Sequence, residues 1–380
     1  MTGPPSSHRY DRIARVRQRV AQAGLDALVV SHLPNIRYLT GFAGTAATFV
    51  VAAGHAALFV DPRYSAAAEE LASRVRPTFD VVVMHGRAED AVAAWLKTLG
   101  GRRVGIEAAS LPVARFTRLA GALAAGRSPA TRRPAAGPSL LPTEGLVEGV
   151  RAVKDAGEIA TMREAARRLS AVAREVTAFV TPGRSERDIA AHVDCALRRA
   201  GFERTAFDTI VASGPNSALP HARPTGRTVG RNEPVVLDFG GVYDGYCVDL
   251  TRTLQADGSP EALRRMFAAV VEAQAAAVGA VRPGVPASDV DAAARAVLDR
   301  HGLGEAIAHG TGHGLGLEVH EEPRLTRPGS GHADLTLEPG MVFTIEPGVY
   351  VPGVGGVRIE DDVLVVEGGA EILTDVPIEL

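Results

Sequence analysis

The sequence predicts two domains, the first of them of the α/β class. From residue 10 to residue 125, segments with apolar residues at helical spacing alternate with short runs of β-branched residues, as expected for an α/β fold. A stretch rich in Gly, Ala and Pro follows at 126–142 and is the best linker candidate. The 380 residues, 46% of them hydrophobic, suffice for two cores. We therefore expect a first domain at 1–145 and a second at 146–380.

The first domain is expected to open with a helix. Ile13, Val16 and Val20 lie at helical spacing within 10–23, and Gly24 follows as a stop signal. Apolar β-branched runs then predict strands, and amphipathic segments predict helices. The expected strands are 27–30, 48–52, 57–60, 81–84 and 104–107, and the expected helices are 65–75, 88–99 and 111–125.

The second domain is expected to begin with two helices and to continue into a β-hairpin. A helical pattern covers 155–179, breaks at a Pro-Gly pair and resumes after Ser185, a residue type that caps helix N-termini. Farther along, apolar runs within 235–253 enclose the pair Asp244-Gly245. That pair favours the tight turn of a hairpin.

The expected hairpin brings two carboxylates together. With the turn at that pair, Tyr243 faces Tyr246 and Gly240 faces Asp249, and Asp238 projects from the same face as Asp249. Side chains so related, one diagonal step apart, lie roughly 7 Å from each other or less. Two carboxylates in an otherwise apolar hairpin repel each other unless a cation or a proton lies between them. A pair of metal ions roughly 3.5–4 Å apart fits this arrangement.

Three further candidate ligands lie in segments of unusual composition. His313 stands in Gly-Thr-Gly-His-Gly-Leu-Gly, Glu346 precedes a Pro-Gly pair, and Glu360 follows Val-Arg-Ile. Glycine permits the close backbone approach that a packed site needs. Together with Asp238 and Asp249 they give four carboxylates and one imidazole, a mainly hard-oxygen set that suits Mn²⁺, Fe²⁺, Co²⁺ or Zn²⁺. We expect two divalent metal ions, with Mn²⁺ as the first choice.

These segments resemble those of the creatinase/prolidase/aminopeptidase P metallopeptidases. Asp-Phe-Gly, Asp-Leu-Thr-Arg, Gly-Thr-Gly-His-Gly-Leu-Gly, Glu-Pro-Gly-Val-Tyr and Arg-Ile-Glu-Asp occur in the order found in that family. Residues 35–42 and 61–64 are similar to segments of the family's smaller amino-terminal domain, so the resemblance spans the chain. It implies an α+β fold class, with a pita-bread catalytic domain preceded by a smaller α/β domain.

The resemblance also implies a role for each matching ligand. Asp238 would bind one metal ion, Asp249 and Glu360 would bridge both ions, and His313 and Glu346 would complete the second. The metal pair would lower the pKa of a bound water and polarise the scissile carbonyl. Glu346 would also carry a proton to the leaving amine.

Three histidines beyond the ligands match pocket positions of the family, and two further residues are expected in the pocket. His221 and His320 would steady the tetrahedral intermediate, and His309 matches a further pocket histidine. Tyr350 is expected to line the pocket. Arg358 is expected to hold a bridging carboxylate in register by a charge-assisted hydrogen bond.

The implied activity is hydrolysis of the Xaa-Pro bond at peptide N-termini, by an Xaa-Pro dipeptidase or an aminopeptidase P. The substrate would be a small peptide with proline at the second position, whose bond lacks the N–H that ordinary peptidases bind. An amide hydrolase or a lyase with the same fold is an alternative, because fold and ligands do not fix the substrate. Metal-free creatinase-like chemistry and a non-catalytic peptide-binding module fit less well, because the chain keeps all the ligand positions. A methionine aminopeptidase would leave the first 145 residues unexplained.

Composition argues against several other classes of protein. No apolar stretch reaches the ~18 residues needed to span a bilayer, and the amino terminus lacks the apolar region of a signal peptide, so we expect a cytoplasmic protein without a membrane partner. Cys195 and Cys247 suggest no disulfide framework and are expected to be small buried residues. Basic residues are interspersed with acidic ones, which argues against a nucleic-acid partner. Tyr38 and Arg63 are expected to be packing and surface residues. Members of this family can also lend amino-terminal residues to the active site of a neighbouring subunit, which needs a dimer. We expect a homodimer.

Not every acidic residue near these motifs is expected to bind metal. A lone Asp or Glu is usually solvated or part of a turn. The residues for which we expect this are Asp244, Asp361, Asp362, Glu321 and Glu322.

Overall fold

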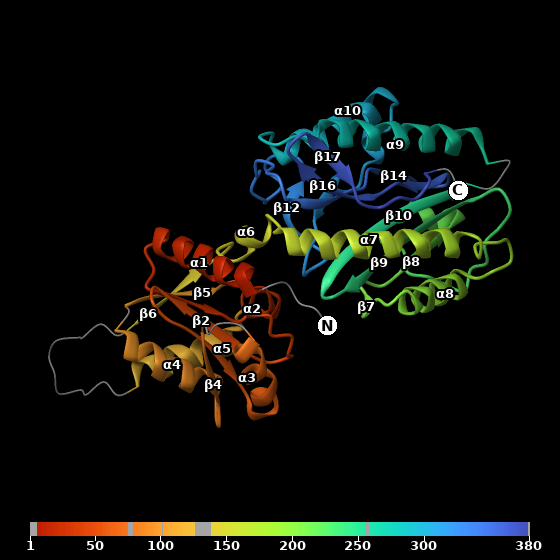
Figure 1. Cartoon of the computed structure of the whole chain (residues 1–380). Helices are drawn as coiled ribbons and strands as arrows, with labels where there is room; N and C mark the ends of the chain where they lie inside the picture. Colours follow the sequence, from red (N-terminus) through yellow and green to blue (C-terminus); the bar gives the residue numbers. More distant parts are fainter. Residues whose placement is uncertain (1–5, 75–78, 101, 126–137, 256–258, 379–380) are drawn as a thin grey trace. The chain divides into compact units, whose positions relative to one another are not determined.

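The computed structural model describes residues 6–74, 79–100, 102–125, 138–255 and 259–378 (Figure 1). They form two compact units that divide after Arg151, a few residues beyond the expected boundary. Each unit has its own sheets and its own hydrophobic core. None of the described helices is both long enough and apolar enough to cross a membrane.

The first unit is a six-stranded sheet with helices, of the α/β class that the sequence predicts. The strand order is β4-β3-β2-β1-β5-β6; β1 to β3 pair antiparallel, and β4, β5 and β6 add in parallel. Its strands are β1 (Ala27–Val30), β2 (Thr48–Ala52), β3 (Ala56–Val60), β4 (Asp80–Val83), β5 (Arg103–Glu107) and β6 (Ser139–Thr143). Its helices are α1 (Ser6–Gln22), α2 (Leu33–Thr40), the short η1 (Pro62–Tyr64), α3 (Ser65–Arg74), α4 (Ala88–Leu99), α5 (Val113–Ala124) and α6 (Glu148–Arg151).

Helix α2 and strand β6 are two of the elements of this unit that were not predicted. Helix α2 has no side-chain cap of its own; instead the Glu107 carboxylate, distant in sequence, accepts hydrogen bonds from the backbone N–H groups of Ser31 and His32 at 2.6 and 2.7 Å. Strand β6 falls within the expected linker but pairs with β5 along its whole length. The linker prediction is therefore wrong for residues 139–142, while residues 126–137 lie outside the described part of the chain.

The second unit has the pita-bread fold, in which two halves each carry a pair of helices on a sheet (Figure 1). In the first half, α7 (Ala156–Thr177) and α8 (Glu186–Arg199) pack on β7 (Arg204–Thr205), β8 (Ile210–Ser213), β9 (Pro234–Tyr243) and β10 (Tyr246–Gln255). A short helix, η2 (Gly214–Ala218), follows β8.

In the second half, α9 (Glu261–Ala280) and α10 (Ala287–Arg300) pack on a five-stranded sheet of order β12-β11-β13-β16-β17. Its strands are β11 (Gly312–Gly314), β12 (Glu321–Leu325), β13 (Val342–Ile345), β16 (Asp361–Val366) and β17 (Gly369–Ile372). A separate two-stranded sheet joins β14 (Gly348–Val351) to β15 (Gly355–Arg358), and the short η3 (Gly304–Ala306) follows α10.

Local sequence signals in the second unit hold as predicted. Asp155 begins α7 with a capping box that it shares with Glu158, and the Ser185 side chain caps α8. Asp244 and Gly245 have φ values of 46° and 81°, as the tight hairpin turn between β9 and β10 requires. The hairpin register is the predicted one, including Tyr243 opposite Tyr246 and Gly240 opposite Asp249.

Candidate metal centre

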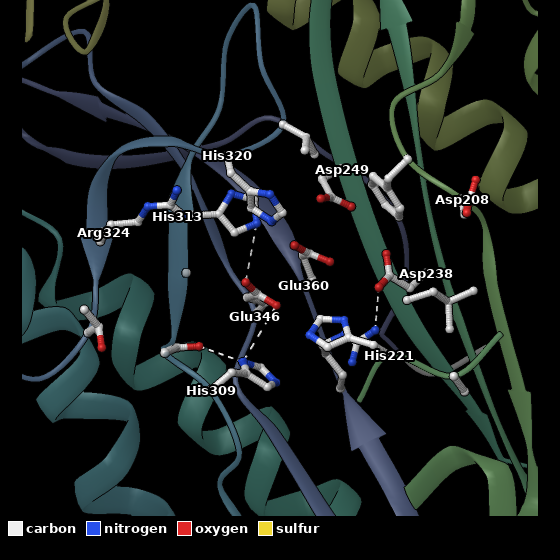
Figure 2. Close-up of a pocket in the computed structure, with 18 of the residues that line it drawn as sticks. Asp208, His221, Asp238, Asp249, His309, His313, His320, Arg324, Glu346 and Glu360 are labelled. Carbon is white, nitrogen blue, oxygen red and sulfur yellow. Dashed lines mark hydrogen bonds and ion pairs between the residues drawn. The ribbon is translucent and has the colours of Figure 1, made fainter. Parts of the chain in front are cut away.

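The expected ligands converge on one cavity of about 580 Å³ in the second unit (Figure 2). Two of them come from the hairpin of the first half, and three come from the second half. Asp238 lies on β9 and Asp249 on β10, while His313 lies on β11, Glu346 directly follows β13, and Glu360 connects β15 to β16. All five line the cavity.

Distances within the cluster are short enough for shared coordination. Asp249, His313 and Glu360 each offer a ligand atom within 4.8 Å of the others, and His313 Nε2 lies 3.5 Å from Glu346 Oε1. Glycine makes this proximity possible, because a Cβ at Gly312 would lie only 1.9 Å from the backbone oxygen of Thr344. Strand β11 can therefore approach β13 only with glycine at this position.

The carboxylates of the cluster lack enough partners within the protein. Among the described residues, Asp238 Oδ1 and Asp249 Oδ1 are buried without a hydrogen-bond partner. Burial, together with repulsion from Asp238, raises the pKa of Asp249. Burial and repulsion from Asp249 likewise raise the pKa of Glu360. Buried carboxylates that repel one another and keep free oxygens fit divalent cations.

Glu346 and His309 form a second group at the edge of the cluster. Burial raises the pKa of Glu346 to about 7, and Glu346 Oε2 lies 3.9 Å from His309 Nδ1. His309 Nδ1 also lies 2.7 Å from the backbone oxygen of Gly310, and its Nε2 lies 2.8 Å from Tyr350 Oη. Only a protonated Nδ1 can donate to that carbonyl, so Nε2 accepts from Tyr350. Burial lowers the pKa of His309 to about 4, which keeps the ring neutral.

The remaining two predicted histidines also face the cavity. His221 and His320 both line it, and the His320 ring meets the His313 ring edge-on with centroids 4.3 Å apart. Desolvation and the neighbouring Arg324 lower the pKa of His320. His320 is therefore a neutral imidazole at pH 7, able to donate one N–H.

Arg358 does not contact a bridging carboxylate as predicted. Its guanidinium donates to Asp238, the ligand expected to bind a single ion, through a short hydrogen bond, and to Tyr350 Oη at 2.5 Å. Its link to Glu360 is indirect: Arg358 Nε donates to Thr251 Oγ1 at 3.1 Å, and Thr251 Oγ1 donates to Glu360 Oε2 at 2.5 Å. Thr251 was missed, although its place two residues after Asp249 puts both side chains on one face of β10.

Several residues expected to be solvated are buried. Asp361 pairs with Arg252 at 2.7 Å, and Asp362 accepts a hydrogen bond from the backbone N–H of Asp249 at 3.1 Å. Glu321 lies 3.5 Å from the buried Lys154. These predictions were wrong because Arg252, the backbone of Asp249 and Lys154 are all distant in sequence from the carboxylates that they contact.

The cysteine prediction holds for only one of the two residues. Cys247 is buried, but Cys195 is exposed. Arg324 and Asp208 are among the charged residues of the cavity wall that were not predicted. Figure 2 shows them on opposite sides of the ligand cluster. Arg324 lies on β12, four positions after His320, without a local signal that marks it.

Comparison with known proteins decides the family. Residues 160–367 match the model of metallopeptidase family M24, and residues 12–153 match the creatinase/prolidase N-terminal domain. The chain belongs to metallopeptidase family M24. The resemblance seen in the sequence and the pita-bread fold are thereby confirmed.

Relatives of this M24 peptidase match it over nearly the whole chain. The uncharacterized peptidase YqhT of Bacillus subtilis is 34% identical, over 97% of this chain and 99% of its own. The Xaa-Pro dipeptidase of Pyrococcus horikoshii is 31% identical, over 97% and 98%. Among solved structures, an Xaa-Pro dipeptidase from Bacillus anthracis is 35% identical with a TM-score of 0.90, covering 98% of this chain and 99% of that one.

Proposed function

We propose that this M24 peptidase hydrolyses dipeptides of the form Xaa-Pro. The observation that carries the proposal is Arg324, which lines the cavity and whose guanidinium makes no hydrogen bond or ion pair with the described residues. A guanidinium so placed suits the free carboxylate of a carboxyl-terminal proline. The similarity to Xaa-Pro dipeptidases supports the same substrate class.

Five residues would hold two divalent metal ions, with Mn²⁺ as the first choice. Asp238 would bind one ion, Asp249 and Glu360 would bridge the pair, and His313 and Glu346 would complete the other. When bound, such ions lower the pKa of a water molecule and polarise the scissile carbonyl. The unpartnered oxygens of Asp238 and Asp249 are the observation that supports this assignment.

Glu346 would move the proton of the reaction. A carboxylate beside the attacking water can act first as general base and then as general acid. It accepts a proton from the attacking water and delivers it to the proline nitrogen. The bond between carbonyl carbon and nitrogen then breaks, and proline leaves as a neutral secondary amine.

Two histidines stabilise the negative charge that develops on the carbonyl oxygen. His221 and His320 line the cavity near the ligand cluster, and His320 is neutral at pH 7, so it can donate an N–H hydrogen bond. A donor already placed where charge develops lowers the barrier of acyl transfer. The chain of hydrogen bonds from Arg358 through Tyr350 to His309 fixes the wall beside Glu346.

The experiment compares three substrates: Ala-Pro, Ala-Pro-amide and Ala-Pro-Ala, with metal-free protein reconstituted with Mn²⁺, Co²⁺ or Zn²⁺. We expect Ala-Pro to be cleaved best, because only it offers its proline carboxylate to Arg324. In Arg324→Gln, kcat/KM for Ala-Pro should fall about 10- to 100-fold, the loss of one charged hydrogen bond. Cleavage of Ala-Pro-amide should change little, which controls for damage to the site.

Other outcomes contradict the proposal in distinct ways. Cleavage of Ala-Pro-Ala in preference to Ala-Pro would make the protein an aminopeptidase P. No turnover of any of the three by metal-loaded protein would move the search to other amides or to lyase substrates. A cytoplasmic location and a homodimer are further parts of this proposal, to be checked by fractionation and by sedimentation.

A further inference from the structure

The pocket histidines His221 and His309 lie on loop segments, outside the helices and strands. His221 follows the short helix η2, and His309 lies between η3 and β11. Their rings must nevertheless keep fixed positions around the ligand cluster. What fixes each segment is a buried carboxylate on the second helix of its own half.

In the first half, that carboxylate belongs to Glu186, the first residue of α8, which is 0% exposed. Its Oε1 accepts from both the backbone N–H and the hydroxyl of Ser213, each at 2.8 Å. Its Oε2 accepts from both the backbone N–H and the hydroxyl of Thr225, at 2.9 and 2.6 Å. Ser213 and Thr225 bracket the segment that carries His221, so one side chain holds both of its ends.

In the second half, the carboxylate belongs to Asp291 on α10, which is 1% exposed. Its Oδ1 accepts from the backbone N–H and the hydroxyl of Thr311, at 3.0 and 2.8 Å. Its Oδ2 accepts from Arg295 Nε at 2.6 Å, and Arg295 Nη2 donates to the backbone oxygen of His309 at 2.8 Å. Residues on both sides of Gly310 are thus held from one helix.

We call the hydrogen bonds of each of these two carboxylates, Glu186 and Asp291, a brace. The brace of Asp291 extends to a candidate metal ligand. The backbone N–H of Glu346 donates to the backbone oxygen of Thr311 at 2.8 Å. Asp291 therefore fixes Thr311, and Thr311 fixes the backbone of Glu346. Glu186 makes no such contact with a candidate ligand in the described part of the chain, where its side chain accepts hydrogen bonds from Ser213, Asn216 and Thr225.

We propose that Glu186 and Asp291 are two independent positioning residues, Glu186 for His221 and Asp291 for His309 and Glu346. Each carboxylate takes both hydrogen-bond donors of a threonine, Thr225 or Thr311, in the segment that it holds. Charge-assisted hydrogen bonds of this kind are stronger and more directional than neutral ones. The two braces share no residue, although Arg358 donates both to the backbone oxygen of Pro220, next to His221, at 3.2 Å and to Tyr350, the hydrogen-bond partner of His309. Each brace should therefore act chiefly on its own side of the cavity.

The first test follows the histidine ring signals of metal-free protein by NMR, assigned with His221→Gln and His309→Gln. Glu186→Gln should shift the His221 signals and leave those of His309 in place, and Asp291→Asn should do the reverse. Asp188→Asn and Asp289→Asn, at exposed carboxylates on the same two helices, should shift neither. Shifts of both histidines in both variants, or of neither in either, would overturn the proposal.

A second, milder pair of variants covers the case in which a charge-removing variant fails to fold. Thr225→Val and Thr311→Val each remove one hydroxyl donor and keep the carboxylate. Thr225→Val should shift only the NMR signals of His221 and Thr311→Val only those of His309, each by less than the charge-removing variant does. Identical spectra for both variants would contradict separate braces.

Metal affinity distinguishes positioning from a general loss of stability, because a general loss of stability would weaken metal binding in both variants alike. By calorimetric titration with Mn²⁺, Asp291→Asn should bind about 10- to 100-fold more weakly, as for loss of a group that orients a ligand, whereas Glu186→Gln should bind like wild type. Equal weakening in both would refute the proposal. This arm depends on the proposed metal site but not on the substrate, so a wild type that binds Mn²⁺ yet leaves Ala-Pro intact would overturn only the proposed function.

Discussion

Glu186 and Asp249 are both buried carboxylates of the catalytic domain, yet their surroundings are opposite. Glu186 accepts hydrogen bonds from Ser213, Asn216 and Thr225 on both of its oxygens, whereas Asp249 keeps a buried oxygen without a partner. Burial alone would raise the pKa of Glu186, but its hydrogen bonds outweigh that effect and lower the pKa. The pKa of Asp249 is raised. A carboxylate with all its partners stabilises the fold, and one that lacks them suits a cation.

The largest effect expected from this comparison is the loss of activity in Asp249→Asn. Removing one bridging charge should lower kcat/KM for Ala-Pro roughly a thousandfold, which corresponds to several kcal/mol of transition-state stabilisation. Asp244→Asn, in the turn of the same hairpin, should keep wild-type activity because Asn tolerates the left-handed backbone there. Undiminished turnover in Asp249→Asn would overturn the metal centre.

Metal binding to the cluster of candidate ligands should stabilise the folded protein, and this gain should not depend on Glu186. Mn²⁺ at about 100 times its Kd should raise the free energy of unfolding by about 2.7 kcal/mol, measured by thermal or denaturant unfolding. Asp249→Asn should show a much smaller gain, and Glu186→Gln the full gain. A wild type whose unfolding does not respond to Mn²⁺, Co²⁺ or Zn²⁺ would show that the cluster holds no such ion.

Stability without metal should change in opposite directions in the two variants. Glu186→Gln should lower the free energy of unfolding by about 2 kcal/mol, because the new amide group faces buried donors. Asp249→Asn should leave it unchanged or raise it, because it removes a repelled charge. Urea unfolding of metal-free proteins measures both, and stabilisation by Glu186→Gln would contradict the comparison.

The smallest expected effect is the change of the free energy of unfolding with pH. In metal-free protein the pKa of Glu346 rises from 4.5 to about 7, so the folded state binds more protons than the unfolded state, and stability falls as pH rises through this range. Each extra proton gives a slope of about 1.4 kcal/mol per pH unit. Glu186 has the opposite sign: its lowered pKa contributes stability above the ordinary value that is lost as pH falls.

The measurement is thermal unfolding from pH 4.5 to 8, with and without Mn²⁺. Bound metal replaces the protons of the cluster. The stability of metal-free protein should therefore decline as pH rises, whereas that of metal-saturated protein should not. Parallel curves in the two conditions would mean that the cluster contributes no such linkage.

Features with local signals could be predicted from the sequence, and features with distant partners could not. The hairpin register followed from the pair Asp244-Gly245, because the turn fixes which residues face each other. Helix α2 was missed because the carboxylate that accepts from the backbone N–H groups just before it belongs to Glu107, a residue of a later strand. Asp362 was placed in solvent because nothing local shows that it would meet the backbone of Asp249.

The same division holds for the site. The ligand positions could be predicted because each stands in a distinctive short motif, although their roles still await the experiments above. Arg324 carries no motif, and it matters only because β12 brings it to the cavity wall. The true partner of Arg358 depends on which strand lies against β15, and the sequence pattern alone does not specify that pairing.

The proposed ligands come from the two halves of the catalytic domain. Asp238 and Asp249 belong to the hairpin of the first half, whereas His313, Glu346 and Glu360 come from segments after residue 300. Bound ions would therefore act as a cross-link between two pieces of chain that are synthesised one after the other. A nascent chain that ends after β10 would display two carboxylates and bind metal weakly, so tight binding would be acquired only when the last strands have joined the domain.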